Sequence, residues 1–180
     1  LAGVVGAINE ELGTGLITNM IQITSIVFIF CALLLRSLVG ATLIIISLYT
    51  RVLVCYGVMG FAGIPLSLYT MPVASLGIGI GVDYVIYVIV RMQEELLDTK
   101  GDYVEASRRA LATTGRAVFF TMMAVVLGCM MFIFSPLKFH MELGLMVGTI
   151  IFLNGLGSLI FVPNLAYLIK PKFMQRYVKK

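Results

Sequence analysis

The chain alternates between long apolar stretches and short polar joins. Five stretches approach or exceed the ~20 mainly apolar residues that cross a hydrocarbon core of ~30 Å. They cover residues 16–35, 38–62, 66–90, 117–134 and 143–169. Because lipid offers no partner to unpaired backbone groups, each stretch is predicted to form a helix. The pattern therefore predicts an all-α polytopic membrane protein with five transmembrane helices.

The longest polar join, residues 91–116, has helical signals of its own. Gly101 interrupts the chain, and Asp102 is suited to cap the helix that follows. We predict a cytoplasmic elbow helix over about 92–116 that lies along the lipid headgroups, with a regulatory docking site as the alternative. Pro65, Pro136 and Pro171 fall at joins, whereas Pro163 lies late in the last stretch and can kink it.

Composition strengthens the membrane interpretation. Hydrophobic residues make up 60% of the chain and charged residues 12%, and the mean hydropathy is +1.04. A soluble domain is about a quarter charged, so a soluble, disordered or nucleic-acid-binding protein is excluded. The three cysteines all lie in apolar stretches, which disfavours a disulfide framework or a metal cluster.

The basic residues are distributed unevenly. Eleven of the 13 Lys and Arg residues fall in joins or the tail on one side, with Lys138 opposite and Arg51 inside a stretch. The positive-inside rule makes the crowded side cytoplasmic. An odd number of spans then puts the N-terminus outside and the C-terminus in the cytoplasm.

Residues 1–15 carry no signal-peptide pattern. An N-terminus on the outer side of the membrane therefore requires an upstream segment that carries it across. We therefore expect a longer parent chain with at least one further span. Residues 1–15 would be the end of an external domain or a short amphipathic helix. Residues 16–169 would form the five-helix bundle, and 170–180 a basic cytoplasmic tail.

Asp83 is one of two residues of the Asp, Glu, Lys and Arg type inside the apolar stretches. It lies eight residues from Arg91, or about 12 Å of helix rise. An ionised carboxylate at that depth costs at least about 2.5–3.5 kcal/mol, so burial favours the neutral form. We interpret Asp83 as a group that binds and releases a proton; the alternative is a hydrogen bond to a neighbouring helix.

The surroundings of Asp83 fit a proton site. Tyr84 adds a hydroxyl that can donate to a carboxylate, and Gly77 with Gly81 permits close approach by a second helix. Residues at a spacing of four share one helix face, and here these are Ser75, Gly79, Asp83 and Tyr87.

Arg51 is the other charged residue inside the apolar stretches. It lies 13 residues, or about 20 Å of rise, from the start of the second stretch. It could pair with Asp83 or act in coupling, but packing against carbonyls, another helix or a water-filled crevice is favoured. The other mid-span polar residues are expected to make interhelical hydrogen bonds; they are Thr121, Thr149, Asn154 and Ser158.

Sequence motifs of known chemistry point away from an enzyme, because no phosphate loop, paired nucleophile and base, or metal-ligand spacing is present. Gly-Ile-Gly-Val-Asp-Tyr at 79–84, followed by Arg91, resembles the GxxxD-Tyr helix of the resistance–nodulation–division (RND) superfamily. The branch it resembles most is the MMPL-like predicted exporters, which are also similar to sterol-sensing domains. Other motifs agree in order, in residues 35–37, 57–66, 110–136 and 163–173.

The resemblance implies two parallel repeats, each with one helix, an external porter domain and then five helices. This chain looks like the last five helices of the second repeat. Asp83 would be the proton acceptor and Tyr84 its hydrogen-bonding partner, facing an equivalent pair in the missing repeat. Candidate neighbours of this relay are Gly79, Tyr87, Thr121 and Arg51, although Arg51 departs from the family's apolar pattern.

The function implied by the resemblance is proton-driven export of lipid or other hydrophobic cargo across a bacterial or archaeal cytoplasmic membrane, without a cofactor. Its partners would be membrane lipids, the cargo, and the missing repeat and porter domains; a homo-oligomer stays open and no nucleic acid is expected. The alternatives are a lipid- or sterol-sensing scaffold that does not pump, and a SecD/SecF-type translocation accessory.

Overall fold

The computed structural model of the chain describes residues 2–64, 70, 72–99 and 101–169, with the backbone alone for 2–14 and 16. All regular structure among these residues is helical. The elements are α1 (Ala2–Leu35), α2 (Leu38–Phe61), α3 (Pro72–Asp98), α4 (Tyr103–Ala110), a π-helix (Leu111–Gly115), α5 (Arg116–Met130), a 3-10 helix (Met131–Phe134) and α6 (Lys138–Ile169).

Five helical segments in the described part of the chain have the length and hydropathy of membrane spans: Ile17–Leu35, Leu38–Phe61, Pro72–Asp98, Tyr103–Phe134 and Lys138–Leu168. The predicted all-α, five-span membrane protein is therefore confirmed. Three predicted features lie outside the described residues: Pro65, the start of the third span at residue 66, and the basic tail 170–180.

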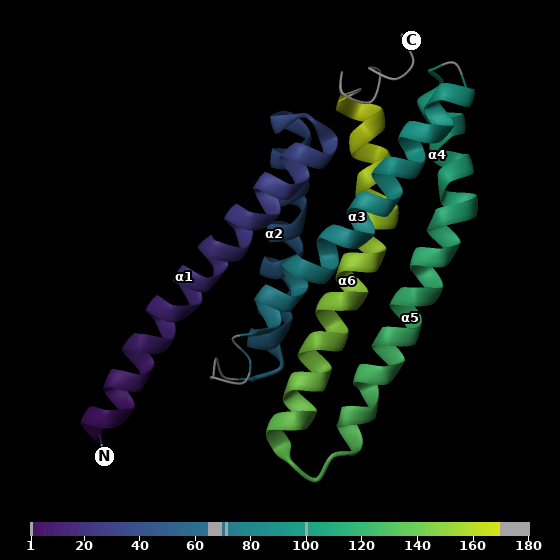
Figure 1. Ribbon diagram of the computed structural model, residues 1–180. Coiled ribbons are helices and arrows are strands. Elements are labelled where there is room, and N and C mark those ends of the chain that lie inside the picture. The colour runs from purple at the N-terminus through teal and green to yellow at the C-terminus, as the bar shows by residue number, and fades with distance from the viewer. Residues whose placement is uncertain (1, 65–69, 71, 100, 170–180) are drawn as a thin grey trace.

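The spans run alternately up and down, so that the α1–α2 and α3–α4 joins lie at one end of the bundle (Figure 1). Arg36 lies in the first of these joins, and Arg108 and Arg109 lie on α4 beside the second. We call this the Arg-rich end. Lys138 begins α6 at the opposite end. Basic residues are thus segregated as the sequence indicates, and the side of the membrane each end faces stays a prediction.

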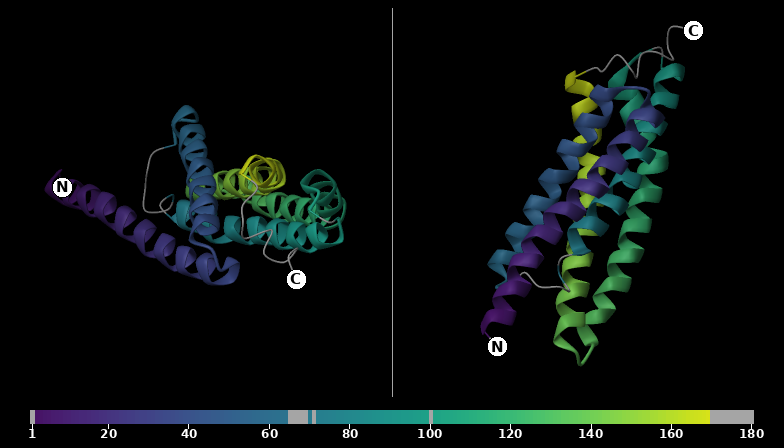
Figure 2. Two further views of the ribbon diagram at one scale, coloured as in Figure 1. Left: turned by 90° about the horizontal axis from the view of Figure 1, so that it is seen from above. Right: turned by 60° about the vertical axis from the view of Figure 1, so that its left-hand side comes forward.

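α3 and α6 form the centre of the bundle. They pack along each other, with α1 and α2 on one side and α5 on the other (Figure 2). These two spans are the most buried and α1 is the least. The 34 residues of α1 span about 51 Å, more than a hydrocarbon core of about 30 Å. Its N-terminal half accordingly projects away from the bundle (Figure 1).

The two central helices meet at glycines. A Cβ on Gly77 would collide with the side chain of Ile150, and one on Gly81 would lie 2.7 Å from the amide atoms of Asn154. Asn154, which is fully buried, donates from Nδ2 to the carbonyl of Gly77 at 2.6 Å. The close approach predicted for Gly77 and Gly81 is confirmed, and the partner is α6.

The turn into α4 forms as the sequence predicts. Gly101 has a φ of +94°, which a glycine adopts without strain. Asp102 caps α4 by accepting from the backbone N–H groups of Val104 at 3.0 Å and Glu105 at 3.4 Å. Each residue therefore has the role that its type indicates.

The elbow expected over about 92–116 is divided between several elements. α3 continues to Asp98, and α4 runs through the π-helix into α5. α4 packs against α3 and buries Tyr103, Ala106 and Ala110. These three residues form an apolar stripe that α4 buries against the end of α3, and the position of this segment along the lipid headgroups stays a prediction.

Candidate functional site

One face of α3 is uncovered, and we call it the Asp83 face. It contains Ser75, Gly79, Asp83 and Tyr87, as the spacing of four predicts. Asp83 and Gly79 are exposed, Tyr87 is 61% exposed and Ser75 is half-buried. A Cβ on Gly79 would have nothing within 4 Å, in contrast to Gly77 and Gly81 on the buried side. The space along this face at Gly79 and Asp83 is therefore open in the described chain.

Asp83 nevertheless lies deep along its helix. It is 11 residues from Pro72 and 15 from Asp98, or about 16 Å and 22 Å of rise. The exposed side chains seven residues before and after it on the same side, Leu76 and Val90, are apolar. A carboxylate at this depth is costly in lipid. The Asp83 face is consequently suited to contact another protein segment or a water-filled path.

α1 borders the Asp83 face. Asn19 of α1 donates from Nδ2 to the hydroxyl of Ser75 at 2.9 Å. This bond fixes α1 beside the start of α3 and leaves Asp83 open. The spacing of the apolar stretches does not predict this contact of Asn19, although an amide is an unusual side chain in such a stretch and marks the position.

Tyr84 lies on the buried side of α3. It is 5% exposed, whereas the adjacent Asp83 points out of the bundle. Consecutive helical residues do not face each other, and no hydrogen bond joins these two side chains within the described structure. The phenol on the same face as Asp83 is that of Tyr87. The roles of both tyrosines in a relay stay predictions.

Arg91 connects the helix of Asp83 to the Arg-rich end. Its guanidinium donates to Glu94 at 2.8 Å and to the buried Glu95 at 2.6 Å. Its Nε also donates to the hydroxyl of Thr113 in the π-helix at 3.4 Å. This contact joins α3 to the segment that leads into α5, a connection that sequence spacing alone does not reveal.

Arg51 lies between α2 and α6, away from Asp83. It is 4% exposed, and Nη2 donates to the hydroxyl of Ser47 at 2.8 Å. The guanidinium rests against Gly157, where a Cβ would lie 2.8 Å from Cζ. The suggested pairing of Arg51 with Asp83 is not formed among the described residues.

Thr121 is exposed on α5 and donates to the carbonyl of Ala117 at 2.9 Å, within its own helix. α5 packs mainly against α6. Thr149 and Ser158 likewise bond to carbonyls of their own helix, at 2.8 Å each. Asn154 is thus the member of the predicted polar group that makes the expected interhelical bond.

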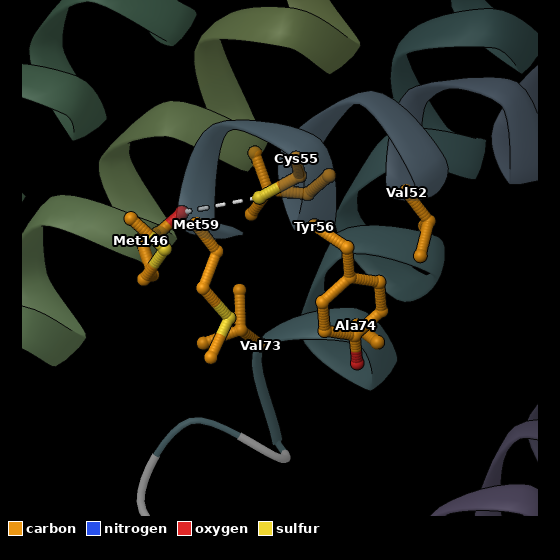
Figure 3. Close-up of a pocket in the computed structure, with 8 residues that line it drawn as sticks. Val52, Cys55, Tyr56, Met59, Val73, Ala74 and Met146 are labelled. Atoms are coloured by element: carbon orange, nitrogen blue, oxygen red, sulfur yellow. Dashed lines mark hydrogen bonds between the residues drawn. The ribbon is translucent and has the colours of Figure 1, made fainter. Parts of the chain in front are cut away.

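A small hollow lies between α2, α3 and α6 (Figure 3). Its volume of about 10 Å³ is at the lower limit for one water molecule. The thiol of Cys55 donates weakly to the carbonyl of Met146 across it, at 3.9 Å. This hollow is a packing gap that is too small for a ligand.

Comparison with known proteins gives one family. The model of the MMPL family matches residues 2–177. A putative membrane protein of Streptomyces coelicolor is 33% identical over 101 residues, which are 56% of this chain and 14% of that protein. A putative membrane protein of Methanocaldococcus jannaschii is 36% identical over 89 residues, 49% of this chain and 22% of that protein.

The trehalose monomycolate exporter MmpL3 of Mycobacterium tuberculosis is 30% identical over 110 residues, 59% of this chain and 12% of the exporter. The matched segments thus span less than a quarter of the length of each of these relatives. No solved structure gives a significant match.

Proposed function

Because the chain belongs to the MMPL family, we propose that it forms part of an exporter of lipids or other hydrophobic molecules, driven by the proton gradient. The similarity to a protein named as a trehalose monomycolate exporter supports a lipid-like cargo. The relatives come from bacteria and an archaeon, which supports a cytoplasmic membrane with the Arg-rich end in the cytoplasm. The rest of the exporter would be the other repeat and the porter domains.

The observation that carries this proposal is the position of Asp83. The carboxyl group is deep along a central helix yet exposed, on a face that α1 borders at Ser75 and that is otherwise open in the described chain. A second helix bundle that covered this face would enclose the acid between two moving parts. Burial penalises the charged form, so uptake or loss of a proton would change how tightly the two bundles pack.

The energies are adequate for a conformational cycle. Each charge that crosses a potential of 100 mV provides about 2.3 kcal/mol. A two-state equilibrium in a protein is typically biased by a few kcal/mol. Protonation of Asp83 can therefore shift the packing of α3, and Arg91 passes that shift to the π-helix through Thr113. Tyr87 provides a hydroxyl on the Asp83 face. Tyr84 follows Asp83 in the sequence and lies on the buried side of α3.

The test is the export of a fluorescent lipid by proteoliposomes that contain the full-length protein, with and without an imposed proton gradient. Asp83→Asn should abolish gradient-dependent export and leave folding intact. Asp98→Asn is the matched control, because the same substitution then falls at the exposed end of the same helix. Undiminished export by a folded Asp83→Asn protein would reject the proposal and favour a lipid-sensing module that does not pump.

A further inference from the structure

A cavity of about 230 Å³ lies between α2 and α6, separate from the Asp83 face of α3. Arg51, Ser47 and Thr50 form its polar part, and the hydroxyl of Thr50 already donates to the carbonyl of Ile46 in its own helix at 2.9 Å. Leu43 and Ile46 of α2, with Phe161 and Leu165 of α6, provide apolar wall. The cavity therefore combines one positive charge with a hydrocarbon lining.

The charge of Arg51 is uncompensated. A guanidinium has five N–H donors on three nitrogens, and here Nη2 donates to Ser47 whereas Nε and Nη1 are buried without a partner. Ion pairs in the described part of the chain do not include Arg51. Buried charges in proteins are normally paired, so this arginine lacks an anion.

Ser47 is oriented to help bind that anion. Its Oγ accepts the bond from Arg51 at 2.8 Å, which leaves its own hydroxyl proton free to donate. Ser47 is only half-buried and lines the cavity. A guanidinium and a hydroxyl donor side by side suit an oxyanion such as a carboxylate or a phosphate.

The outer wall indicates how the anion would arrive. Ile46 is 58% exposed and Phe161 is 56% exposed, so the cavity borders the outer surface of the bundle through apolar side chains. Arg51 lies 13 residues from the start of α2, or about 20 Å of rise. At that depth the surroundings of the bundle are lipid tails, which exclude a water-soluble anion.

The size of the cavity sets the part of the ligand it holds. Sites that enclose a whole small molecule usually measure about 300–1,000 Å³. A cavity of about 230 Å³ is smaller, and it suits an anionic group with the first segment of an alkyl chain. The rest of the chain would extend past Ile46 and Phe161 into the bilayer.

We propose that Arg51 and Ser47 bind the carboxylate or phosphate group of an anionic amphiphile, which enters laterally from the membrane between α2 and α6. The site uses no residue of the Asp83 face. It therefore stands or falls separately from proton-driven export.

The test is photolabelling of the full-length protein in lipid nanodiscs. Three probes carry the same diazirine in the alkyl chain: palmitic acid, a phosphatidic acid, and the neutral palmityl alcohol. Labelled peptides are mapped by mass spectrometry. Both anionic probes should label the α2 segment around Arg51 and the α6 segment around Phe161 about tenfold more than the alcohol, since a charge-assisted pair has that order of effect. Arg51→Gln should remove the preference, and Arg51→Lys should keep part of it.

A competition arm separates an amphiphile from a free anion. Excess inorganic phosphate should leave the labelling unchanged, because the approach is through lipid. Loss of labelling with phosphate would overturn the amphiphile as the ligand. Equal labelling by the neutral and anionic probes would overturn the role of Arg51.

A second variant decides the matter if Arg51→Gln fails to fold. Ile46→Trp fills the cavity at its lipid-facing wall and keeps Arg51, so labelling by the anionic probes should fall about tenfold. Leu53→Trp is the matched control, because Leu53 is 68% exposed on α2 and outside the cavity. Unchanged labelling of a folded Ile46→Trp protein would refute the site.

Discussion

The contact between α3 and α6 should respond very differently to the same substitution at two glycines of α3. An added methyl group at Gly81 would lie 2.7 Å from three atoms of the Asn154 amide, whereas at Gly79 it would meet nothing within 4 Å. Asn154 is fully buried and holds the carbonyl of Gly77 at 2.6 Å. The Asn154 side chain can make room for the methyl group only if its hydrogen bond to Gly77 breaks or if α3 and α6 move apart.

The expected magnitude follows from these contacts. Overpacking a close contact costs about 1–3 kcal/mol, and an interhelical hydrogen bond in a membrane protein contributes about 0.6 kcal/mol. Replacing glycine by alanine in a helix gains up to about 1 kcal/mol, and this gain is common to both variants. Gly81→Ala should therefore be about 2–3 kcal/mol less stable than Gly79→Ala.

The assay is reversible unfolding in mixed micelles with increasing SDS, followed by the loss of helical circular dichroism. A double-mutant cycle with Asn154→Ala identifies the cause, because removing the amide makes room for the methyl group. The cycle should give a coupling free energy of about 1–2 kcal/mol between positions 81 and 154. Equal stability of Gly81→Ala and Gly79→Ala, or additive effects in the cycle, would refute the close contact.

Three further predictions concern single side chains. Ser37 caps α2 through its hydroxyl, so Ser37→Ala should cost about 0.5–2 kcal/mol in the SDS titration; Thr42→Ala, on the exposed side of α2, should change stability by less than about 0.5 kcal/mol. Glu105→Gln removes two surface ion pairs and should lower the melting temperature slightly at low salt but not at about 1 M salt. Tyr87 and Leu53 are both exposed in this chain. If another bundle covers the Asp83 face, a lipid-soluble maleimide should label Tyr87→Cys in the full-length protein more slowly than Leu53→Cys on α2. Equal labelling rates would contradict the presence of a covering bundle.

The number of spans and the local turns could be predicted from the sequence because they depend on nearby residues. Apolar length sets the spans, and the conformation of Gly101 and the cap at Asp102 follow from residue type. The glycine face of α3 was predictable from spacing. Its partner was not, because the choice of α6 depends on Ile150 and Asn154, about seventy residues away.

The candidate site was predictable in one dimension only. Depth and face of Asp83 follow from counting residues along a helix. Adjacency in sequence does not bring the hydroxyl of Tyr84 to that carboxylate, since neighbouring helical residues diverge. The contact of Arg91 with Thr113 and the position of Arg51 against Gly157 are tertiary. No local pattern encodes them.

Proton movement through the full-length protein tests the central claim most directly. Proteoliposomes that enclose a pH-sensitive dye, with a lipid cargo present, report proton entry after a gradient is imposed. The wild type and Asp98→Asn should dissipate the gradient at the same rate, while folded Asp83→Asn should be no faster than empty liposomes. A folded Asp83→Asn protein that dissipated the gradient at the wild-type rate would contradict the assignment of Asp83 as the proton carrier.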